Sequence, residues 1–174
     1  RDGRFDGRGH RLKNWKASAG LFKLVGEGAT VSNLIIDKSC SMKVSSKGDV
    51  YQVGFIADKN MGTVRGCTNE GSIAHKCSYA SGPLWIGGLV GDNRYVIRDC
   101  RNSGKISSDV EGGLFKEEVS LALGGITGGA AGKPYRTSII VGCENTGEIS
   151  AIGGLAVYFI GGIAGNSNVR TTLK

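Results

Sequence analysis

Three of the five cysteines stand at the same place in a recurring block, where thiols at a regular spacing could bind a metal ion or form disulfides. The block reads C-x-N-x-G-x-I and begins at Cys67, Cys100 and Cys143. No C-x-x-C or C-x-x-H pair accompanies it, so the ligand spacing typical of a zinc site is missing. We therefore expect these thiols to stack inside the protein as small apolar side chains, with no metal bound. Cys40 and Cys77 stand outside the block, and the sequence leaves open whether they pair.

Groups able to catalyse a reaction are few and scattered. Nothing in the sequence places either histidine, His10 or His75, beside a partner that would complete a nucleophilic site. We expect a structural hydrogen bond from His10 and a loop position for His75. Glu117 and Glu118 are neighbours, so in a strand they would point to opposite faces and could not form the facing pair of a glycosidase. The sequence predicts no catalytic residue and no cofactor.

Side chains suited to binding gather in three stretches, residues 75–85, 107–123 and 129–138, which we interpret as interruptions of a repeat. Aromatic rings and cationic groups there could stack on a sugar or on an aromatic side chain of a partner. The candidate ligand-binding residues are Tyr79, Trp85, Lys133, Tyr135 and Arg136. Trp85 also has a structural interpretation, in which its ring fills a gap in the wall of the fold.

The elements that must position these side chains follow a repeat of about 34 residues. A glycine-led block begins at Gly20, Gly54, Gly88, Gly125 and Gly162. Glycine makes up 30 of the 174 residues and proline only 2, and each glycine inside a helix costs about 1 kcal/mol relative to alanine. Helical repeats are therefore disfavoured, and the units look too short for propeller blades. The pattern predicts an all-β fold, a single-stranded parallel β-helix (a β-solenoid) with about five coils of about 34 residues.

In such a solenoid, residues at equivalent positions of successive coils lie one above another. We expect Asn69, Asn102 and Asn145 to form a ladder in which the side-chain amides hydrogen-bond along the axis. The alternative is that they are unrelated turn residues. We divide the chain, as one domain, into a lead-in, four repeat units and a truncated unit. Their bounds are 1–19, then 20–53, 54–87, 88–124 and 125–161, then 162–174.

The two blocks together resemble the GLUG-motif repeats of bacterial surface and secreted proteins. The resemblance is carried by G-L-V-G-D-N at Gly88, by the C-x-N-x-G blocks, and by F-D-G-R-G-H-R-L at Phe5. It extends from about Phe5 to Asn168. The resemblance implies a right-handed parallel β-helix on an extracellular, adhesin-like protein. It supplies no catalytic residue.

The charge and hydropathy of the chain narrow the choice of partners. The formal net charge is +7, with a basic cluster between Arg1 and Lys16 that could attract anionic glycans or act only as a solvated cap. No nucleic-acid-binding motif is present, and no run of about 18 apolar residues could insert in a membrane.

We expect a non-enzymatic extracellular repeat module, located outside the cell or on a bacterial surface. It would bind a glycan or a cell-surface protein, or serve as a stalk, beside other domains of a larger precursor. The alternative is a β-helix polysaccharide lyase or glycoside hydrolase that acts on acidic polysaccharide.

Overall fold

The protein is built from short parallel strands. The structure is a computed structural model, and it describes residues 3–48, 51–80, 82–110, 120–132, 137–153, 157–167 and 171–173. In these ranges the chain forms 25 strands and no helix. Among these residues, no helix is long and apolar enough to cross a bilayer. The strands form five parallel sheets, numbered here in the order in which a complete turn of the chain passes through them.

Sheet 1 contains β1 (Arg4–Asp6), β5 (Thr30–Ser32), β10 (Thr63–Arg65), β15 (Val96–Arg98), β20 (Ser138–Val141) and β25 (Thr171–Leu173). Sheet 2 contains β2 (Arg11–Leu12), β6 (Ile35–Ile36), β11 (Thr68–Asn69), β16 (Arg101–Asn102) and β21 (Glu144–Asn145). Sheet 3 contains β3 (Lys16–Ala17), β7 (Ser41–Gly48), β12 (Ser72–Ala80), β17 (Ile106–Val110) and β22 (Ile149–Gly153). Sheet 4 contains β8 (Tyr51–Val53), β13 (Leu84–Gly87), β18 (Ser120–Gly124) and β23 (Val157–Gly161). Sheet 5 contains β4 (Phe22–Val25), β9 (Ala57–Asn60), β14 (Val90–Asn93), β19 (Thr127–Ala130) and β24 (Ala164–Ser167).

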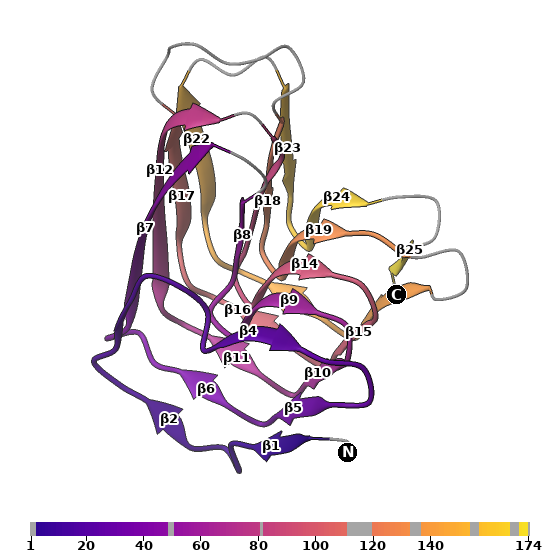
Figure 1. The fold of residues 1–174 in the computed structure, drawn as a ribbon. Helices are drawn as coiled ribbons and strands as arrows, with labels where there is room; N and C mark the ends of the chain where they lie inside the picture. The colour runs from indigo at the N-terminus through magenta and orange to yellow at the C-terminus, as the bar shows by residue number, and fades with distance from the viewer. Residues whose placement is uncertain are drawn as a thin grey trace.

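Each complete turn visits the five sheets once and then stacks on the turn before it (Figure 1). Four turns contribute a strand to every sheet, whereas the first turn contributes none to sheet 4, because residues 18–21 form no strand. The predicted all-β parallel solenoid is therefore confirmed. The coil count is slightly lower than expected, with four complete turns and a shorter first turn.

Neighbouring turns are aligned at a regular offset along the chain. Thr63 pairs with Thr30 and Val96 pairs with Thr63, an offset of 33 residues. The offset grows to 37 where Leu121 pairs with Leu84, and to 43 where Ile139 pairs with Val96. The added residues fall within 107–123 and 129–138, two of the stretches expected to interrupt the repeat.

One predicted interruption is small, and one detail of the predicted alignment was wrong. Residues 75–85 include parts of β12 and β13 that pair with both neighbouring turns, and the pairing of β12 with β7 shifts register between Cys77 and Tyr79. The glycine series also shifts by one residue in the second turn. Val53 pairs with Ile86 and Ala57 pairs with Val90, so Phe55, not Gly54, stands at the level of Gly88. A buried aromatic side chain replaces glycine there.

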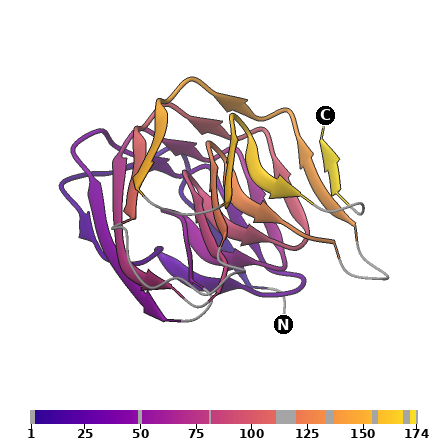
Figure 2. The same cartoon turned by 90° about the horizontal axis from the view of Figure 1, so that it is seen from above.

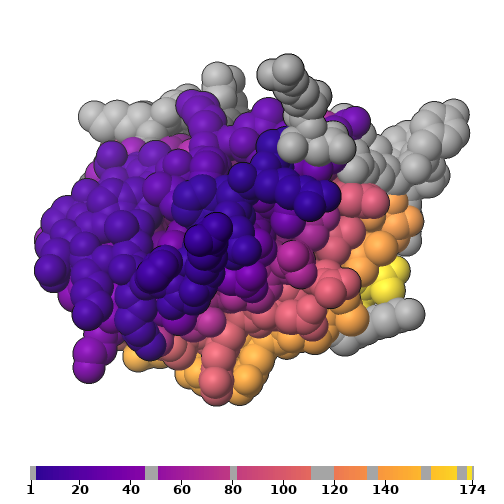
Figure 3. Space-filling view, turned by 90° about the horizontal axis from the view of Figure 1, so that it is seen from below, coloured from indigo at the N-terminus to yellow at the C-terminus, as the bar shows by residue number. Residues whose placement is uncertain are grey.

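The long strands of sheets 3 and 4 stand upright as two facing layers, and sheet 5 leads away from the foot of sheet 4 (Figure 1). Viewed from above, the early turns lie toward the left of the picture and the later turns toward its top and right, so successive turns are also displaced sideways (Figure 2). From below, the first turn covers much of the lower end of the stack (Figure 3). The core runs through all turns and includes Phe55, Ile73 and Leu84, each at most 1% exposed.

Glycines bring sheet 5 close to sheet 4 at the foot of the upright layers. A Cβ atom on Gly91 would collide with the backbone of Gln52 and Val53, and one on Gly128 would collide with the backbone of Trp85 and Ile86. Gly165 lies against Leu123 in the same way. Gly91, Gly128 and Gly165 are each the last residue of a recurring G-x-x-G block. The block therefore allows the close contact between the two sheets.

Candidate functional site

The asparagines of the recurring block lie in one column, buried at Asn69 and Asn102 and half-buried at Asn145. Asn69 Nδ2 donates to Asn102 Oδ1 at 2.7 Å, and Asn102 Nδ2 donates to Asn145 Oδ1 at 2.8 Å. The same amide nitrogens of Asn69 and Asn102 also donate to the carbonyls of Gly71 and Gly104, each at 3.0 Å. Because these bonds lie within the protein, the ladder stabilises the stack and offers nothing to a ligand.

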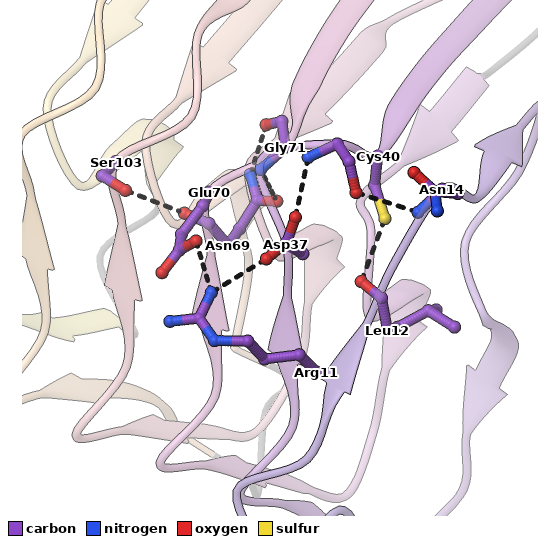
Figure 4. A network of polar contacts seen from close by, with 10 residues as sticks. Arg11, Leu12, Asn14, Asp37, Cys40, Asn69, Glu70, Gly71 and Ser103 are labelled. Carbon is purple, nitrogen blue, oxygen red and sulfur yellow. Dashed lines mark hydrogen bonds and ion pairs between the residues drawn. The ribbon is translucent and has the colours of Figure 1, made fainter.

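The outer side of this column carries an ion-pair network between turns (Figure 4). Arg11 Nη1 lies 2.7 Å from a Glu70 carboxylate oxygen and 3.1 Å from one of Asp37. Part of the basic lead-in is thus neutralised by acidic side chains of the next two turns. Since Arg11 is exposed, these pairs contribute little to stability.

The three cysteines of the block lie in register beside the asparagines. Cys67 and Cys100 are buried and Cys143 is half-buried. Each thiol donates to the carbonyl two residues earlier, at 3.2–3.4 Å. Hydrogen bonding with Cys143 and Cys67, together with burial, raises the pKa of the Cys100 thiol. Cys100 is therefore protonated near neutral pH, whereas hydrogen bonding with Cys100 lowers the pKa of the Cys67 and Cys143 thiols.

Neither a disulfide nor a metal site is found among the described residues. No disulfide joins any of the five cysteines, so Cys40 and Cys77 are not linked to each other. Cys40 instead donates to the carbonyl of Leu12 at 3.1 Å. No group of three histidine, cysteine or carboxylate side chains in the described ranges could hold a metal ion.

A second polar ladder was missed in the sequence. Asn60 Nδ2 donates to Asn93 Oδ1 at 2.7 Å, and Asn93 Nδ2 donates to Ser138 Oγ at 2.9 Å. All three side chains are fully buried. The signal was present, because Asn60 and Asn93 are 33 residues apart, the same offset as Asn69 and Asn102. Aligning Gly54 with Gly88 shifted the motifs by one residue and concealed it.

The position predicted for His75 was wrong. It lies within β12, where Ile73, His75 and Cys77 point inward and the residues between them point outward. The ring is 1% exposed, contacts Ser108 Oγ through Nδ1 at 2.8 Å, and stacks on Tyr51 with 5.9 Å between ring centroids. Burial lowers the pKa of His75 to about 4, so the ring is neutral at neutral pH. His10, in contrast, is exposed.

The candidate site is the outer corner where sheets 4 and 5 meet, which we call the corner groove. Gln52 and Trp85 belong to its sheet 4 side, and Lys59 and the buried Asp92 belong to its sheet 5 side. Trp85 pairs with Gln52 and Asp92 pairs with Lys59, so each wall continues from one turn to the next. The groove widens near Gln52 and Lys59 into a hollow of about 410 Å³. A smaller hollow of about 90 Å³ lies beside Trp85 at the other end.

Trp85 lies on the outer face of sheet 4, because its neighbours Leu84 and Ile86 point into the core. Its ring lies against Gly129 of the next turn, where a Cβ atom would approach the ring atoms to 3.0–3.3 Å. Its indole Nε1 is buried but has no hydrogen-bond acceptor within the described protein. A buried donor without a partner costs about 1–3 kcal/mol. The contact with Gly129 agrees with a ring that packs in the wall, and the free Nε1 donor gives the same ring a group that could bind a ligand.

Charged groups surround this ring. The guanidinium carbon of Arg94 lies 5.7 Å from the centroid of the Trp85 ring, within range of a cation–π interaction. Arg94 Nε donates to both Asp92 carboxylate oxygens at 2.8 Å, and Lys59 Nζ lies 3.9 Å from Asp92. Burial raises the pKa of Asp92, whereas the Arg94 hydrogen bond opposes that rise. In the described part of the chain, the two terminal amino groups of Arg94 have no protein partner.

Only one of the five predicted ligand-binding residues can be placed at this groove. Trp85 forms its centre. Tyr79 belongs to β12, but its side chain is outside the description. Lys133, Tyr135 and Arg136 lie outside the described residues altogether. The sequence analysis missed Arg94, Asp92 and Lys59 as groove residues, because only the register of the solenoid brings them to the same corner as Trp85.

Comparison with protein-family models, with curated proteins and with solved structures finds no match for this chain. The resemblance to GLUG-motif repeats stays a prediction. The corner groove is the part of the structure that bears on the function of this protein.

Proposed function

We propose that this chain is a non-enzymatic binding module that holds carbohydrate in the corner groove, as part of an extracellular or cell-surface protein of bacterial adhesin type. The observation that carries the proposal is Trp85, an outward-pointing indole flanked by the hydrogen-bonded charges of Arg94 and Asp92. Sugars are bound in proteins by aromatic rings beneath their apolar faces and by charged or polar groups around their hydroxyls. The groove supplies both on rigid strands.

The extracellular location is supported by the solenoid, by the motif resemblance and by the state of the thiols. Four of the five cysteines are buried, so oxidants outside the cell would have little access to them. A location on the surface would also suit a long, regular stack that presents one groove along its side.

Binding to a panel of immobilised glycans tests the proposal. The wild-type chain should bind at least one glycan class, and Trp85→Ala should lower the affinity about tenfold or more through loss of stacking. Ile152→Ala is the matched control, because Ile152 is an apolar side chain of sheet 3 that is 65% exposed. This variant should bind as the wild type does. Absence of glycan binding, or equal loss in both variants, would contradict the proposal and favour a protein ligand or a stalk.

An enzymatic alternative has one observation in its favour. Asp58 lines the larger hollow beside Lys59, and burial raises its pKa, as is usual for a general acid. Asp58 already accepts a hydrogen bond from the Gly20 backbone at 2.9 Å, which suits a structural role. A polysaccharide lyase or glycoside hydrolase would release fragments from acidic polysaccharides, and Asp58→Asn would abolish that release. We expect no turnover.

A further inference from the structure

Exposed apolar side chains gather at the two ends of the stack, of which Figure 3 shows the lower one. Among the described residues, every large apolar side chain that is exposed belongs to the first turn or to the last. They are Phe5, Leu21 and Leu24 in the first turn, and Ile152, Phe159, Ile160 and Leu173 in the last. Phe5 and Leu24 also line an apolar hollow of about 220 Å³ beside β1 and β4. Apolar surface gathered in this way marks a place where another molecule docks.

Some of these side chains are the ends of columns that are buried in the turns between. In sheet 1, the pairing of the strands places the residues of one such column one above another. They are Phe5, Val31, Val64, Ile97, Ile140 and Leu173. Phe5 is 40% exposed and Leu173 is 52% exposed, whereas the residues between them are at most 4% exposed. The first and last members are therefore the two open ends of one apolar column.

A second apolar column passes through the connection that leads into sheet 5. Its residues each stand directly before a paired residue of β4, β9, β14, β19 or β24. They are Leu21, Ile56, Leu89, Ile126 and Ile163. The middle three are fully buried, whereas Leu21 is exposed and Ile163 is half-buried. The first turn of a second chain could therefore continue both columns from the last turn of the first chain.

The backbone offers the same continuation. In the described chain, β1, β2, β3 and β4 of the first turn have a strand neighbour on one side only, and so have β21, β22, β24 and β25 of the last turn. The pairings between turns are parallel, so the two free edges run in the same direction. The unpaired N–H and C=O groups of a strand edge are a template for a strand of another molecule. Four of the five sheets could thus continue from one copy into the next.

Charged side chains in sheet 2 are placed so that the two ends attract each other. Glu144 pairs with Arg101, and their exposed side chains form an ion pair at 3.1 Å. From Arg101, the same sheet leads through β11 and β6 to Arg11 at its other edge. Arg11 of a second copy would therefore lie beside Glu144, on the side opposite Arg101.

Sheet 3 repeats this arrangement of charges. Ile149 and Ala17 are the two ends of one column, which passes through β17, β12 and β7. Glu148 stands directly before Ile149, and Lys16 stands directly before Ala17. Glu148 already pairs with Lys105 of its own chain at 2.8 Å. Lys16 of a second copy would meet the same carboxylate from the other side.

We propose that copies of this chain stack head to tail, with the last turn of one copy against the first turn of the next. The inference does not depend on the proposed glycan binding. Because the two faces are different surfaces of the chain, one contact leaves a free face at each end, and assembly continues beyond a dimer. Such a stack repeats the corner groove at regular intervals, which strengthens attachment to a surface that carries many copies of a ligand.

Sedimentation equilibrium and light scattering over a range of concentrations test the proposal. The average mass of the wild-type chain should rise with concentration, up to about 1 mM, and should pass the mass of a dimer without a plateau. Leu173→Asp places a charge at the end of the sheet 1 column and should weaken association about tenfold or more. Ile152→Asp is the matched control, because Ile152 is also exposed in the last turn but lies beyond the part of β22 that matches β3. This variant should associate as the wild type does.

Exchanging the charges of one pair gives the most specific test. Lys16→Glu brings two carboxylates together at the contact, and Glu148→Lys brings two ammonium groups together. At low salt, each variant alone should therefore associate about fivefold more weakly than the wild type. In a mixture of the two variants, every contact between unlike chains joins opposite charges, so the mixture should associate as the wild type does. Circular dichroism of each variant checks that it folds.

The outcomes are distinct from those of the glycan panel. Head-to-tail stacking is overturned if the wild-type chain stays monomeric at about 1 mM or stops at a dimer. It is also overturned if mixing Lys16→Glu with Glu148→Lys does not restore association, or if Ile152→Asp weakens association as much as Leu173→Asp does. None of these results would affect the proposed binding of carbohydrate in the corner groove, which the glycan panel tests by itself.

Discussion

Two columns of side chains run along the same solenoid and differ in composition. The inner column repeats one residue, with Asn69, Asn102 and Asn145 bonded to one another and to backbone groups. The outer column on sheet 4 runs through Gln52, Trp85, Ala122 and Phe159, with a different residue at each turn. Where a side chain has to hydrogen-bond to the equivalent side chain of the turns above and below, the position keeps one residue type. A position whose side chain does not bond to its own copy is free to vary, so specificity can develop there without cost to the stack.

The largest expected effect comes from breaking the inner column at its middle. Asn102→Ala removes the bonds to both Asn69 and Asn145, and it also removes the amide that donates to the carbonyl of Gly104. Each lost hydrogen bond costs about 1 kcal/mol, so the free energy of unfolding should fall by about 3 kcal/mol. Urea unfolding followed by circular dichroism measures the change. Glycan binding by the folded variant should remain unchanged, because the ladder does not reach the groove.

Ser103→Ala is the control for this variant, because Ser103 is exposed and adjacent in the same strand connection. It should shift stability by less than about 0.5 kcal/mol. A loss below about 1 kcal/mol in Asn102→Ala would show that water replaces the amide bonds, and the ladder would then be a consequence of the stack and not a support for it.

Glycine next to the ladder offers a second test. A Cβ atom on Gly125 would overlap both Asn145 and the carbonyl of Gly162, whereas one on Gly162, at the same position of the next turn, would meet nothing within 4 Å. Gly125→Ala should therefore lower the free energy of unfolding by about 2 kcal/mol, the usual cost of overpacking. Gly162→Ala should be neutral or slightly stabilising, because alanine restricts the unfolded chain. Equal effects in the two variants would contradict the close-packing role of the repeated glycine.

The repeat made the inner column easy to predict from the sequence, whereas the outer column was difficult to predict. Cys67, Cys100 and Cys143 mark the register through an identical block that returns after 33 and then 43 residues, so the fold and the column followed from the recurring block. The groove depends on pairs such as Trp85 and Arg94, which belong to no shared motif. Their contact results from the angle between sheets 4 and 5, and nothing in local propensity encodes that angle. The one-residue shift at Phe55 shows the same limit, because a bulky core residue replaced the glycine used for alignment.

The last of these effects concerns His75, a titratable ring buried inside the stack. Burial lowers the folded pKa of His75 to about 4, against about 6.5 in the unfolded chain. Between these values the unfolded chain binds a proton that the folded protein does not, so stability falls as pH drops through this window. From pH 7 to pH 5 the contribution of His75 to the free energy of unfolding should fall by about 2 kcal/mol.

Other buried groups act in the opposite direction, so the measurement is a difference between variants. Burial raises the pKa of both Asp58 and Asp92, and each therefore takes up a proton more readily in the folded protein, which favours folding as pH falls. Urea unfolding of the wild type and His75→Gln at pH 7 and pH 5 cancels these shared contributions. The variant should lack the 2 kcal/mol loss, whereas His10→Gln should keep it because His10 is exposed. If His75→Gln loses as much stability on acidification as the wild type, the ring is already charged or solvated in the folded protein. Water would then reach the interior between sheets 3 and 4. At sheet 3 the inner column would be no better protected from solvent than the corner groove.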